Sequence, residues 1–329
     1  DDIDIVMESG LFMQKAGIDV VTAISVIRWL MELYEKGLIT EKDTDGVAMK
    51  WGSRDAIMSM LEKMSERKGV GNVLADGLAA AAEHFGKDTE QYAYHSKGLA
   101  LYAVPTPNLL APFKDLALAS VAGSRGDTLQ IQLSFEHYEG LKEASKPYDA
   151  SSASRLGKAL RMDIGDKEIS EKTFDYRAYE GTPEVMIYAD EEVIINDCLS
   201  TCKLRGFHLP YPFSERYQAE LFSAGLGREV SADKLFAVAG RVKNLERAFC
   251  ARRGMTRETD SLGEQFFKEI KSGSNKGISL SYDQLEKMKD RYYELKGWDI
   301  KTGIPTRETL EKSGLKDVAD DLEKEDKLP

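Results

Sequence analysis

Apolar residues recur every three or four positions along much of this chain, and this spacing constrains the fold more than any other feature. Over residues 20–34 the large apolar side chains share one face of a helix, which Gly37 is placed to end. The pattern returns over residues 54–68, where Ser53 is a candidate N-cap, and over residues 285–295. The sequence therefore predicts a mainly α protein.

Strand signals are sparse in comparison. Residues 185–188 and 193–195 are short apolar runs that fit either a strand or a helix, whereas the Ala-rich residues 73–85 predict a helix. Residues 105–128 show the weakest periodicity and combine three prolines with a Gly-Ser-Arg-Gly-Asp-Thr cluster. We expect a long ordered loop there, of a kind that often carries function.

Composition excludes several classes of protein. The 329 residues carry a formal charge of −11 with no dense Lys/Arg block, which argues against nucleic acid as a partner. No run of about 18 uncharged apolar residues occurs, so no membrane-spanning helix is expected. Three cysteines are too few for a disulfide scaffold, and with no signal peptide they predict a reducing, cytoplasmic location.

Only a few residues are candidates for chemistry on spacing alone. Cys198 and Cys202 form a CxxxC pair, which fits either buried or inert thiols, or ligands of a metal or cluster. His95 fits a structural hydrogen bond or a functional role. Lys97 and Arg125 flank the long loop, and both have side chains suited to bind an anion.

Two aspartates lie beside helix-like segments. Asp19 and Asp197 are each candidate helix caps on position alone. Taken without any resemblance, the residues lead to a helical protein with one functional loop and one CxxxC pair. A non-catalytic helical module is the alternative. If the chain exists alone, it would expose a bare apolar surface, and such a surface needs a partner.

The motifs near both ends of the chain follow a fixed order that is more informative. At the C-terminal end the order is Glu246-Arg247-Ala-Phe249, Arg253-Gly-Met-Thr-Arg257, Asp260-Ser-Leu262, Tyr292-Tyr-Glu-Leu-Lys-Gly-Trp-Asp299 and Gly303-Ile-Pro-Thr306. Near the start it is Lys15-Ala-Gly-Ile-Asp-Val20, Trp29-Leu-Met-Glu-Leu-Tyr-Glu-Lys-Gly37 and Lys50-Trp-Gly52. Together they resemble the tungsten-pterin aldehyde ferredoxin oxidoreductase family over nearly the whole chain.

The resemblance implies an architecture. Members of the family have a β-rich first domain that holds a tungsten bis-molybdopterin cofactor, and two mostly helical domains that close over it. This chain resembles the helical domains alone, which we place at residues 1–95 and 96–329. The family's CxxCxxxC motif, which supplies three ligands of a [4Fe–4S] cluster, is not in the sequence. We expect it upstream or on a partner chain, so that the chain is a fragment, a processed product or a subunit.

The first pterin-binding motif of the family reads roughly Asp-x-x-Gly-Leu-(Asp or Cys). Residues 14–19 resemble it, with Gln14 in place of the leading Asp. The resemblance assigns Gly17, Ile18 and Asp19 to the cofactor.

The second copy of this motif resembles residues 197–202. Asp197 and the closing cysteine match, while Gly-Leu is replaced by Ser-Thr. The resemblance assigns Asp197 and Thr201 to the pterin. It makes Cys202 the fourth ligand of the [4Fe–4S] cluster, a role that suits a thiolate.

The family's Arg-Gly-x-Asp-His-Leu-Arg loop resembles the segment that begins at Arg125. Its His, thought to act beside the metal, is Thr128 here, and Thr cannot shuttle protons near neutral pH as His can. Lys97 matches a Lys-Gly-Leu segment near the cofactor. Lys97, Arg125 and Thr128 are thus the catalytic candidates.

The resemblance implies a function with several partners. A small-molecule aldehyde would be oxidised to a carboxylate, and electrons would leave through the [4Fe–4S] cluster to ferredoxin or an electron-transfer subunit; a homodimer is left open. The changed His favours an alternative, a related tungsten enzyme with another substrate, such as the tungsten subunit of a benzoyl-coenzyme A reductase.

Overall fold

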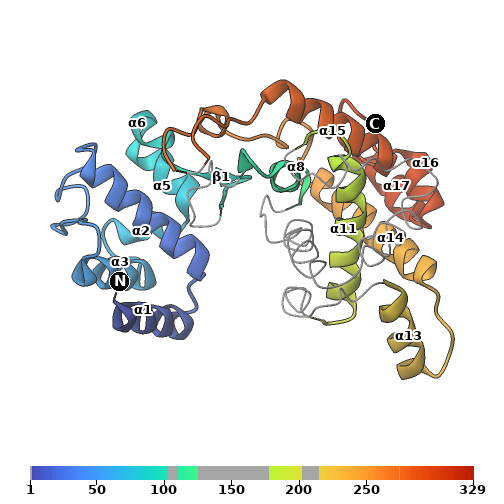
Figure 1. Cartoon of the computed structure of the whole chain (residues 1–329), viewed down its shortest axis with the longest axis horizontal. Coiled ribbons are helices and arrows are strands. Elements are labelled where there is room, and N and C mark those ends of the chain that lie inside the picture. The colour runs from blue at the N-terminus through green and yellow to red at the C-terminus, as the bar shows by residue number, and fades with distance from the viewer. Residues whose placement is uncertain (1, 102–109, 125–177, 202–214, 274) are drawn as a thin grey trace, which may run out of the picture. The chain divides into compact units, whose positions relative to one another are not determined.

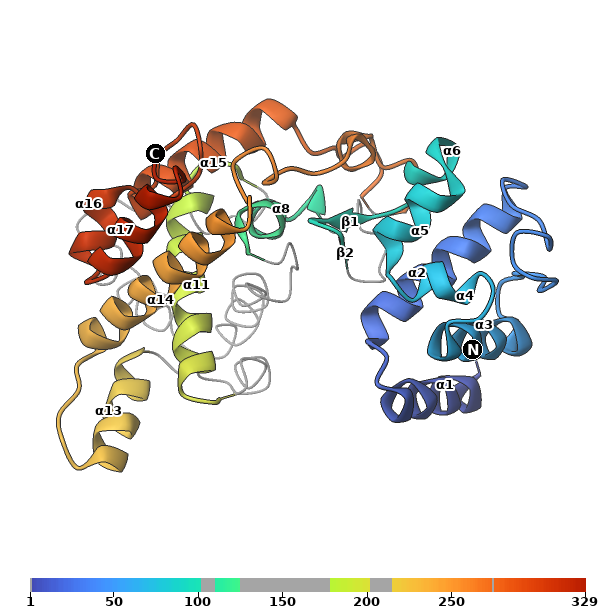
Figure 2. The ribbon, with the colours of Figure 1, turned by 180° about the vertical axis from the view of Figure 1, so that it is seen from behind.

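The computed structural model describes residues 2–101, 110–124, 178–201, 215–273 and 275–329. They fall into two compact units, and each unit is built from more than one stretch of the chain. Unit 1 takes residues 2–101, 110–111 and 261–280, and unit 2 takes residues 112–124, 178–201, 215–260 and 281–329, within those described limits. Figures 1 and 2 show that helices dominate both units, which confirms the mainly α prediction.

Unit 1 consists of short and medium helices with one small hairpin. Its elements are α1 (Ile3–Ala16), α2 (Val20–Glu35), α3 (Arg54–Glu66), α4 (Gly71–Leu74), α5 (Leu78–Phe85), α6 (Lys87–Glu90), β1 (His95–Ser96), β2 (Leu99–Ala100) and the 3₁₀ turn η3 (Glu264–Phe267). Helices α2 and α3 confirm two of the predicted periodic segments. Ser53 caps α3 as predicted, since its hydroxyl accepts a hydrogen bond from the Ala56 amide at 3.2 Å.

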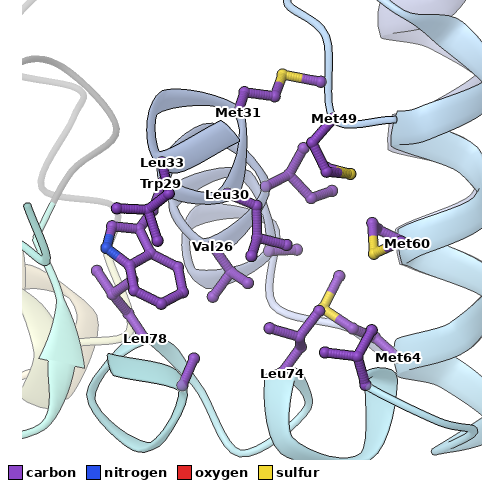
Figure 3. Packing of buried hydrophobic residues seen from close by; sticks show 14 of the residues in the cluster. Val26, Trp29, Leu30, Met31, Leu33, Met49, Met60, Met64, Leu74 and Leu78 are labelled. Atoms are coloured by element: carbon purple, nitrogen blue, oxygen red, sulfur yellow. The ribbon is translucent and has the colours of Figure 1, made fainter. Parts of the chain in front are cut away.

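The core of unit 1 is apolar and centres on α2. Figure 3 shows Trp29 and Leu30 of α2 packed among side chains from α3, α4 and α5, such as Met60, Leu74 and Leu78. These five side chains are almost fully buried. The indole N–H of Trp29, which would otherwise be an unpaired donor, donates to a backbone carbonyl at 3.2 Å. Burial of apolar area is therefore the main stabilising term in this unit.

Close backbone contact between α3 and α4 depends on glycine. A Cβ at Gly71 would lie 2.2 Å from the backbone carbonyl of Lys63, so any larger residue would push the two helices apart. The predicted helix over residues 73–85 is divided in two. Helix α4 ends at Leu74, and α5 begins after Gly77, whose φ of 98° breaks the helical path.

Unit 2 is built from longer helices. Its elements are α8 (Lys114–Ala122), α11 (Thr182–Cys198), α13 (Glu215–Leu226), α14 (Ala232–Arg252), α15 (Tyr282–Lys296), α16 (Arg307–Lys312) and α17 (Lys316–Lys324). Helix α11 packs against α14, α15 and α8 (Figures 1 and 2). It also settles the ambiguous runs at residues 185–188 and 193–195, which are both helical.

Helix α8 corrects the prediction of a long loop over residues 105–128. All nine of its residues are buried, including Lys114 and Asp115. A helix that is enclosed on every side shows no polar face, so its sequence has no amphipathic period to detect. Residues 105–109 and 125–128 of the predicted loop lie outside the described residues.

Family-domain boundaries at residues 1–95 and 96–329 stay a prediction. The described helices include none that is long and apolar enough to cross a lipid bilayer.

Candidate functional site

The first predicted cofactor motif lies where α1 ends and α2 begins. Gly17 adopts the left-handed conformation, with φ 68°, and its amide donates to the Gln14 carbonyl at 3.4 Å. The Ile18 amide donates to the Met13 carbonyl at 3.0 Å. These two hydrogen bonds define a Schellman motif, in which a left-handed residue closes the last turn of a helix.

The second predicted motif has the same backbone geometry at the end of α11. Ser200 is left-handed, with φ 56°, and its amide donates to the Asp197 carbonyl at 3.2 Å. The Thr201 amide donates to the Asn196 carbonyl at 2.9 Å. Two stretches far apart in sequence, which share only a loose residue pattern, therefore form matching helix ends. Gly17 corresponds to Ser200, and Ile18 to Thr201.

The aspartates of the two motifs differ in the hydrogen bonds that they make. Asp19 is exposed and is the N-cap of α2, where its carboxylate accepts from the Thr22 amide at 2.7 Å; this confirms the cap prediction for Asp19. Asp197 lies in the last turn of α11 rather than at a cap. Its exposed carboxylate makes no hydrogen bond or ion pair with the described residues, so both oxygens can accept from a ligand.

Ile18 and Thr201 hold their helix ends through different contacts. Ile18 is half-buried and packs against the apolar core of unit 1. The Thr201 hydroxyl donates to the Asn196 side chain at 2.9 Å and also reaches its carbonyl oxygen at 3.2 Å. The packing of Ile18 and the hydrogen bonds of Thr201 each hold the backbone at the end of a helix in place.

Cys198 is an exposed thiol, so it is not buried, while its role as an inert thiol or a ligand stays a prediction. Partial burial and the neighbouring Asp197 raise the pKa of Cys198, which leaves it protonated at neutral pH and a poor ligand. It lines a cavity of about 600 Å³ between α11, α13 and α14, with mostly apolar walls. Cys202 lies outside the described residues.

Lys97 is at the tip of the β1–β2 hairpin. Lys97 and Gly98 both have positive φ, 51° and 83°, as a two-residue type I′ turn requires. His95, paired with Ala100 in this hairpin, is half-buried, and burial lowers its pKa so that the imidazole is neutral at pH 7. Its Nδ1 atom is buried and has no hydrogen-bond partner among the described residues.

Arg125 and Thr128 lie outside the described residues, but the residue before them does not. The Ser124 hydroxyl donates to the Glu246 carboxylate at 2.6 Å. This contact joins the end of α8 to α14. It is the nearest described anchor of the predicted catalytic segment.

The motif residues near the C-terminus form a buried ion-pair cluster. Arg247, on α14, contacts both carboxylate oxygens of Asp260 at 3.1 and 2.7 Å, and its Nε donates to the Gly303 carbonyl at 2.7 Å. The Tyr293 hydroxyl also donates to the Asp260 carboxylate, and the Lys289 ammonium donates to the backbone carbonyl of Asp260. The charge of the buried Arg247 guanidinium is therefore compensated by a carboxylate inside unit 2, so that loss of either partner would leave a buried charge unpaired.

A second buried cluster was missed by the sequence analysis. Lys243 is 3.0 Å from Asp190 on α11, and both side chains are 5% exposed. Lys296 lies 3.5 Å from the same carboxylate, and the Tyr292 hydroxyl donates to it at 2.8 Å. One signal was present: Lys243 and Arg247 fall on the four-residue repeat that marks the buried face of α14.

A metal site cannot be assembled from the described residues. Among them, no three His, Cys, Asp or Glu side chains lie close enough to hold an ion. A [4Fe–4S] cluster with four thiolates needs more cysteines than the three in the whole sequence. Each helix end has an exposed Asp side chain beside it, Asp19 after α1 and Asp197 in the last turn of α11, and each carboxylate is able to accept hydrogen bonds from a polar heterocycle.

Comparison with known proteins places the chain in a family. The model described as aldehyde ferredoxin oxidoreductase, domains 2 & 3, matches residues 1–315. The chain belongs to this family and represents its helical domains.

Several relatives extend beyond this chain. The tungsten-containing aldehyde ferredoxin oxidoreductase of Pyrococcus furiosus is 25% identical over 320 residues, covering 96% of this chain and 46% of that protein. The aliphatic sulfonate oxidoreductase, WOR-like subunit, of the same organism is 27% identical over 312 residues, covering 92% and 41%. The chain therefore spans about half the length of the curated relatives that it matches.

A solved structure supports the same fold. The active-site complex BamBC of benzoyl-coenzyme A reductase with 1,5-dienoyl-CoA matches with a TM-score of 0.74 at 24% identity, over 99% of this chain and 48% of that chain. At this identity the likeness shows the fold alone.

Proposed function

We propose that this chain supplies the helical domains of a tungsten-dependent oxidoreductase that oxidises aldehydes to carboxylates and passes the electrons to ferredoxin. The observation that carries the proposal is the family match over residues 1–315, strengthened by two matching helix ends at the motifs assigned to the cofactor. The remaining part of the enzyme, a domain that holds most of the cofactor, would be contributed by further sequence or by a partner subunit.

The tungsten bis-molybdopterin would supply the two-electron chemistry when bound. On this chain, Asp197 would accept hydrogen bonds from ring N–H groups, because its carboxylate is exposed and has no partner among the described residues. Asp19 would do so with the oxygen that does not cap α2. Gly17 and Ile18 would offer the backbone at the end of α1 to the cofactor, and Thr201 would offer the backbone at the end of α11.

Cys202 would donate one thiolate to the [4Fe–4S] cluster. It follows Thr201 directly in the sequence. The other thiolates would come from outside this chain. Electrons would leave the enzyme through that cluster, to ferredoxin or to an electron-transfer subunit.

Lys97, Arg125 and Thr128 would act on the substrate side. Lys97 and Arg125 offer cationic groups that would hold an anionic substrate or product, such as a carboxylate. Thr128 can form a hydrogen bond but cannot serve as a general base near neutral pH. The sequence difference at this position favours a second candidate, a related tungsten enzyme that acts on another substrate.

That second candidate is also consistent with the diversity of the relatives. Proteins similar to this chain carry names for aldehyde and sulfonate oxidation and for a reductase complex with a coenzyme A thioester. Two of those names describe a subunit or a complex. We therefore extend the proposal to an enzyme that works with at least one further protein component in the cytoplasm; a homodimer is compatible with it.

The test is reduction of benzyl viologen by the anaerobically purified holoenzyme with acetaldehyde and benzaldehyde, beside a benzoyl thioester assay. The aldehyde proposal expects turnover with an aldehyde. Turnover with the thioester alone would support the second candidate, and a metal-free protein would support a non-catalytic module.

A matched pair of variants sharpens this test. Asp197→Asn should lower the tungsten content per chain, because an amide replaces the proposed pterin acceptor. Asp233→Asn, at another exposed aspartate of unit 2, should leave it unchanged. Equal tungsten in both variants would remove Asp197 from the cofactor site.

A further inference from the structure

The cavity of about 600 Å³ between α11, α13 and α14 lies wholly within unit 2. Helix α14 packs against both α11 and α13 (Figures 1 and 2). The lining includes Ile195, Leu235 and Ala239, which belong to a cluster of buried apolar residues, and Leu199 and Phe222, which pack against that cluster. Sites for small molecules are likewise mostly apolar and have volumes of about 300–1,000 Å³. The cavity is thus suited to the apolar part of a small molecule.

Three charged side chains also line the cavity, and all three are exposed. Arg228 and Lys234 are cations, and Glu229 is an anion. The Cys198 thiol adds no charge at neutral pH, because burial and Asp197 raise its pKa. Neither Arg228 nor Lys234 has an ion pair or a side-chain hydrogen bond with the described residues. The lining therefore carries one net positive charge, and both of its cations are able to bind an anion.

Hydrogen bonds hold the backbone that carries the two cations. The Arg228 amide donates to the Ser223 carbonyl at 3.2 Å, and the Val230 amide donates to the Ser223 hydroxyl at 2.8 Å. Lys234 lies in the first turn of α14, where its amide donates to the Ser231 hydroxyl at 3.2 Å. The backbone at both cations is therefore ordered before a ligand arrives, which lowers the entropic cost of binding.

We propose that this cavity binds a medium-chain monocarboxylate, a molecule with an apolar chain and one anionic end. The chain would lie against the apolar lining, where burial of each methylene group is favourable. The carboxylate would lie at Arg228 and Lys234, since both are cationic and arginine offers paired N–H donors. Glu229 would repel a second negative charge, which favours a monocarboxylate over a dicarboxylate. Binding of this kind involves no reaction, so it does not depend on the proposed function.

The test measures binding of decanoate to the anaerobically purified holoenzyme by isothermal titration calorimetry. Decanol, which has the same chain without the charge, and propionate, which has the charge without the long chain, are the comparison ligands. Alkylation by N-ethylmaleimide at mildly alkaline pH, followed by peptide mass spectrometry, reports occupancy independently. Cys198 is the reporter, because it is an exposed thiol in the lining, and Cys250, which is half-buried and outside the lining, is the reference.

Decanoate should bind about tenfold more tightly than decanol, because decanol makes no charged contact with the two cations. Propionate should bind more weakly still, because it buries few methylene groups. Saturating decanoate should slow the alkylation of Cys198 and leave the alkylation of Cys250 unchanged.

Variants separate the two parts of the site. Arg228→Gln and Lys234→Gln should each weaken decanoate binding about threefold to fivefold, since single exposed charge pairs contribute little. Val238, which also lines the cavity, is 41% exposed, so Val238→Asp should fold and should weaken binding about tenfold by placing a carboxylate beside the apolar chain. Lys287→Gln is the matched control, because it removes an exposed lysine of α15 that is not in the lining.

Equal affinities for decanoate and decanol, unchanged by Arg228→Gln and Lys234→Gln, would overturn the inference, because the cations would then take no part in binding. Full reactivity of Cys198 at the solubility limit of decanoate would overturn it as well. If Cys198 resists alkylation before decanoate is added, while Cys250 reacts, another part of the enzyme covers the cavity, and the inference is likewise wrong.

Discussion

Unit 1 and unit 2 differ in how they build a stable interior. The buried cluster of unit 1 consists of apolar side chains, five of them methionines, around Trp29 and Leu30 (Figure 3). The interior of unit 2 combines apolar clusters with full charges, in the pairs Arg247–Asp260 and Lys243–Asp190. Apolar packing is tolerant of shape, whereas buried ion pairs demand one geometry.

The difference suggests what each unit is for. A methionine-rich core adapts to neighbouring groups, because the unbranched side chain fills irregular space. The ion pairs of unit 2 connect α11, α14 and α15 and reach Ser124 through Glu246. Rigid geometry is therefore concentrated in the unit whose helices carry the second cofactor motif and the start of the predicted catalytic segment.

The largest effect is expected from breaking the Arg247–Asp260 pair. Arg247→Met should lower the free energy of unfolding of unit 2 by about 3–5 kcal/mol, because it leaves a buried carboxylate without its main partner. Replacing both residues, with Arg247→Met and Asp260→Leu, should recover part of the loss. Urea unfolding measures both, and a double variant less stable than the single one would contradict this explanation.

A core truncation in unit 1 should have a comparable or somewhat smaller effect. Leu30→Ala removes a fully buried side chain and should cost about 2–5 kcal/mol, depending on how far the neighbours close the cavity. Unlike the loss at Arg247, this cost should not vary with pH. Fluorescence separates the two units, because Trp29 and Trp51 lie in unit 1 and Trp298 in unit 2. In a Trp298→Phe variant, the two remaining tryptophans report on the unfolding of unit 1 only.

The pH dependence of stability should distinguish the units next. Burial favours the neutral form of Asp190, but Lys243 and Lys296 outweigh it and lower its pKa. Burial likewise opposes the charge on Lys243, but Asp190 and Glu246 raise its pKa overall. The stability from Asp190 is present above its unfolded pKa of about 4 and is lost as pH falls through the lower folded value.

Lys243 sets the pH limit of stability at the alkaline end. Its contribution is present below the unfolded pKa of about 10 and is lost as pH rises through the higher folded value. Urea midpoints of unit 2 should therefore fall at both extremes, and more steeply than those of unit 1. Lys243→Met with Asp190→Leu is the control that should flatten the profile. Parallel profiles for the two units in wild type would contradict the comparison.

The smallest effect concerns the two matching helix ends. Ser200 occupies a left-handed conformation that Gly17 adopts without strain, so Ser200→Gly should stabilise the end of α11 by up to about 1 kcal/mol. Gly17→Ser should destabilise the end of α1 by a similar amount. Opposite signs at matched positions are the expected result in urea unfolding. Equal signs would mean that the two ends are not equivalent.

How far the sequence predicts this molecule differs from element to element. Helices α2 and α3 were predictable because each has one apolar face and a recognisable end. Helix α8 was not, since it is buried all round and its segment also holds prolines that indicate a loop. The buried charges at Lys243 and Asp190 were missed because residue type suggests a solvated surface for both.

The candidate site was predictable only in part. The residue pattern singled out both stretches that the resemblance assigns to the cofactor, an assignment that stays a prediction, and Asp19 was expected at a helix cap, as observed. Their common geometry was not foreseen, because Ser200 lacks the glycine that usually marks a left-handed position. The exposed position of Cys198 and the contact between Ser124 and Glu246 depend on tertiary packing, which spacing along the sequence does not report.

The central claim is that this chain forms part of a tungsten–iron–sulfur enzyme, and elemental analysis tests it most directly. Protein purified anaerobically from its native source should contain tungsten and about four iron atoms per copy of this chain. A cysteine-rich domain, covalently attached or co-purifying, should accompany it. A folded, homogeneous preparation that lacks both metals would contradict the claim.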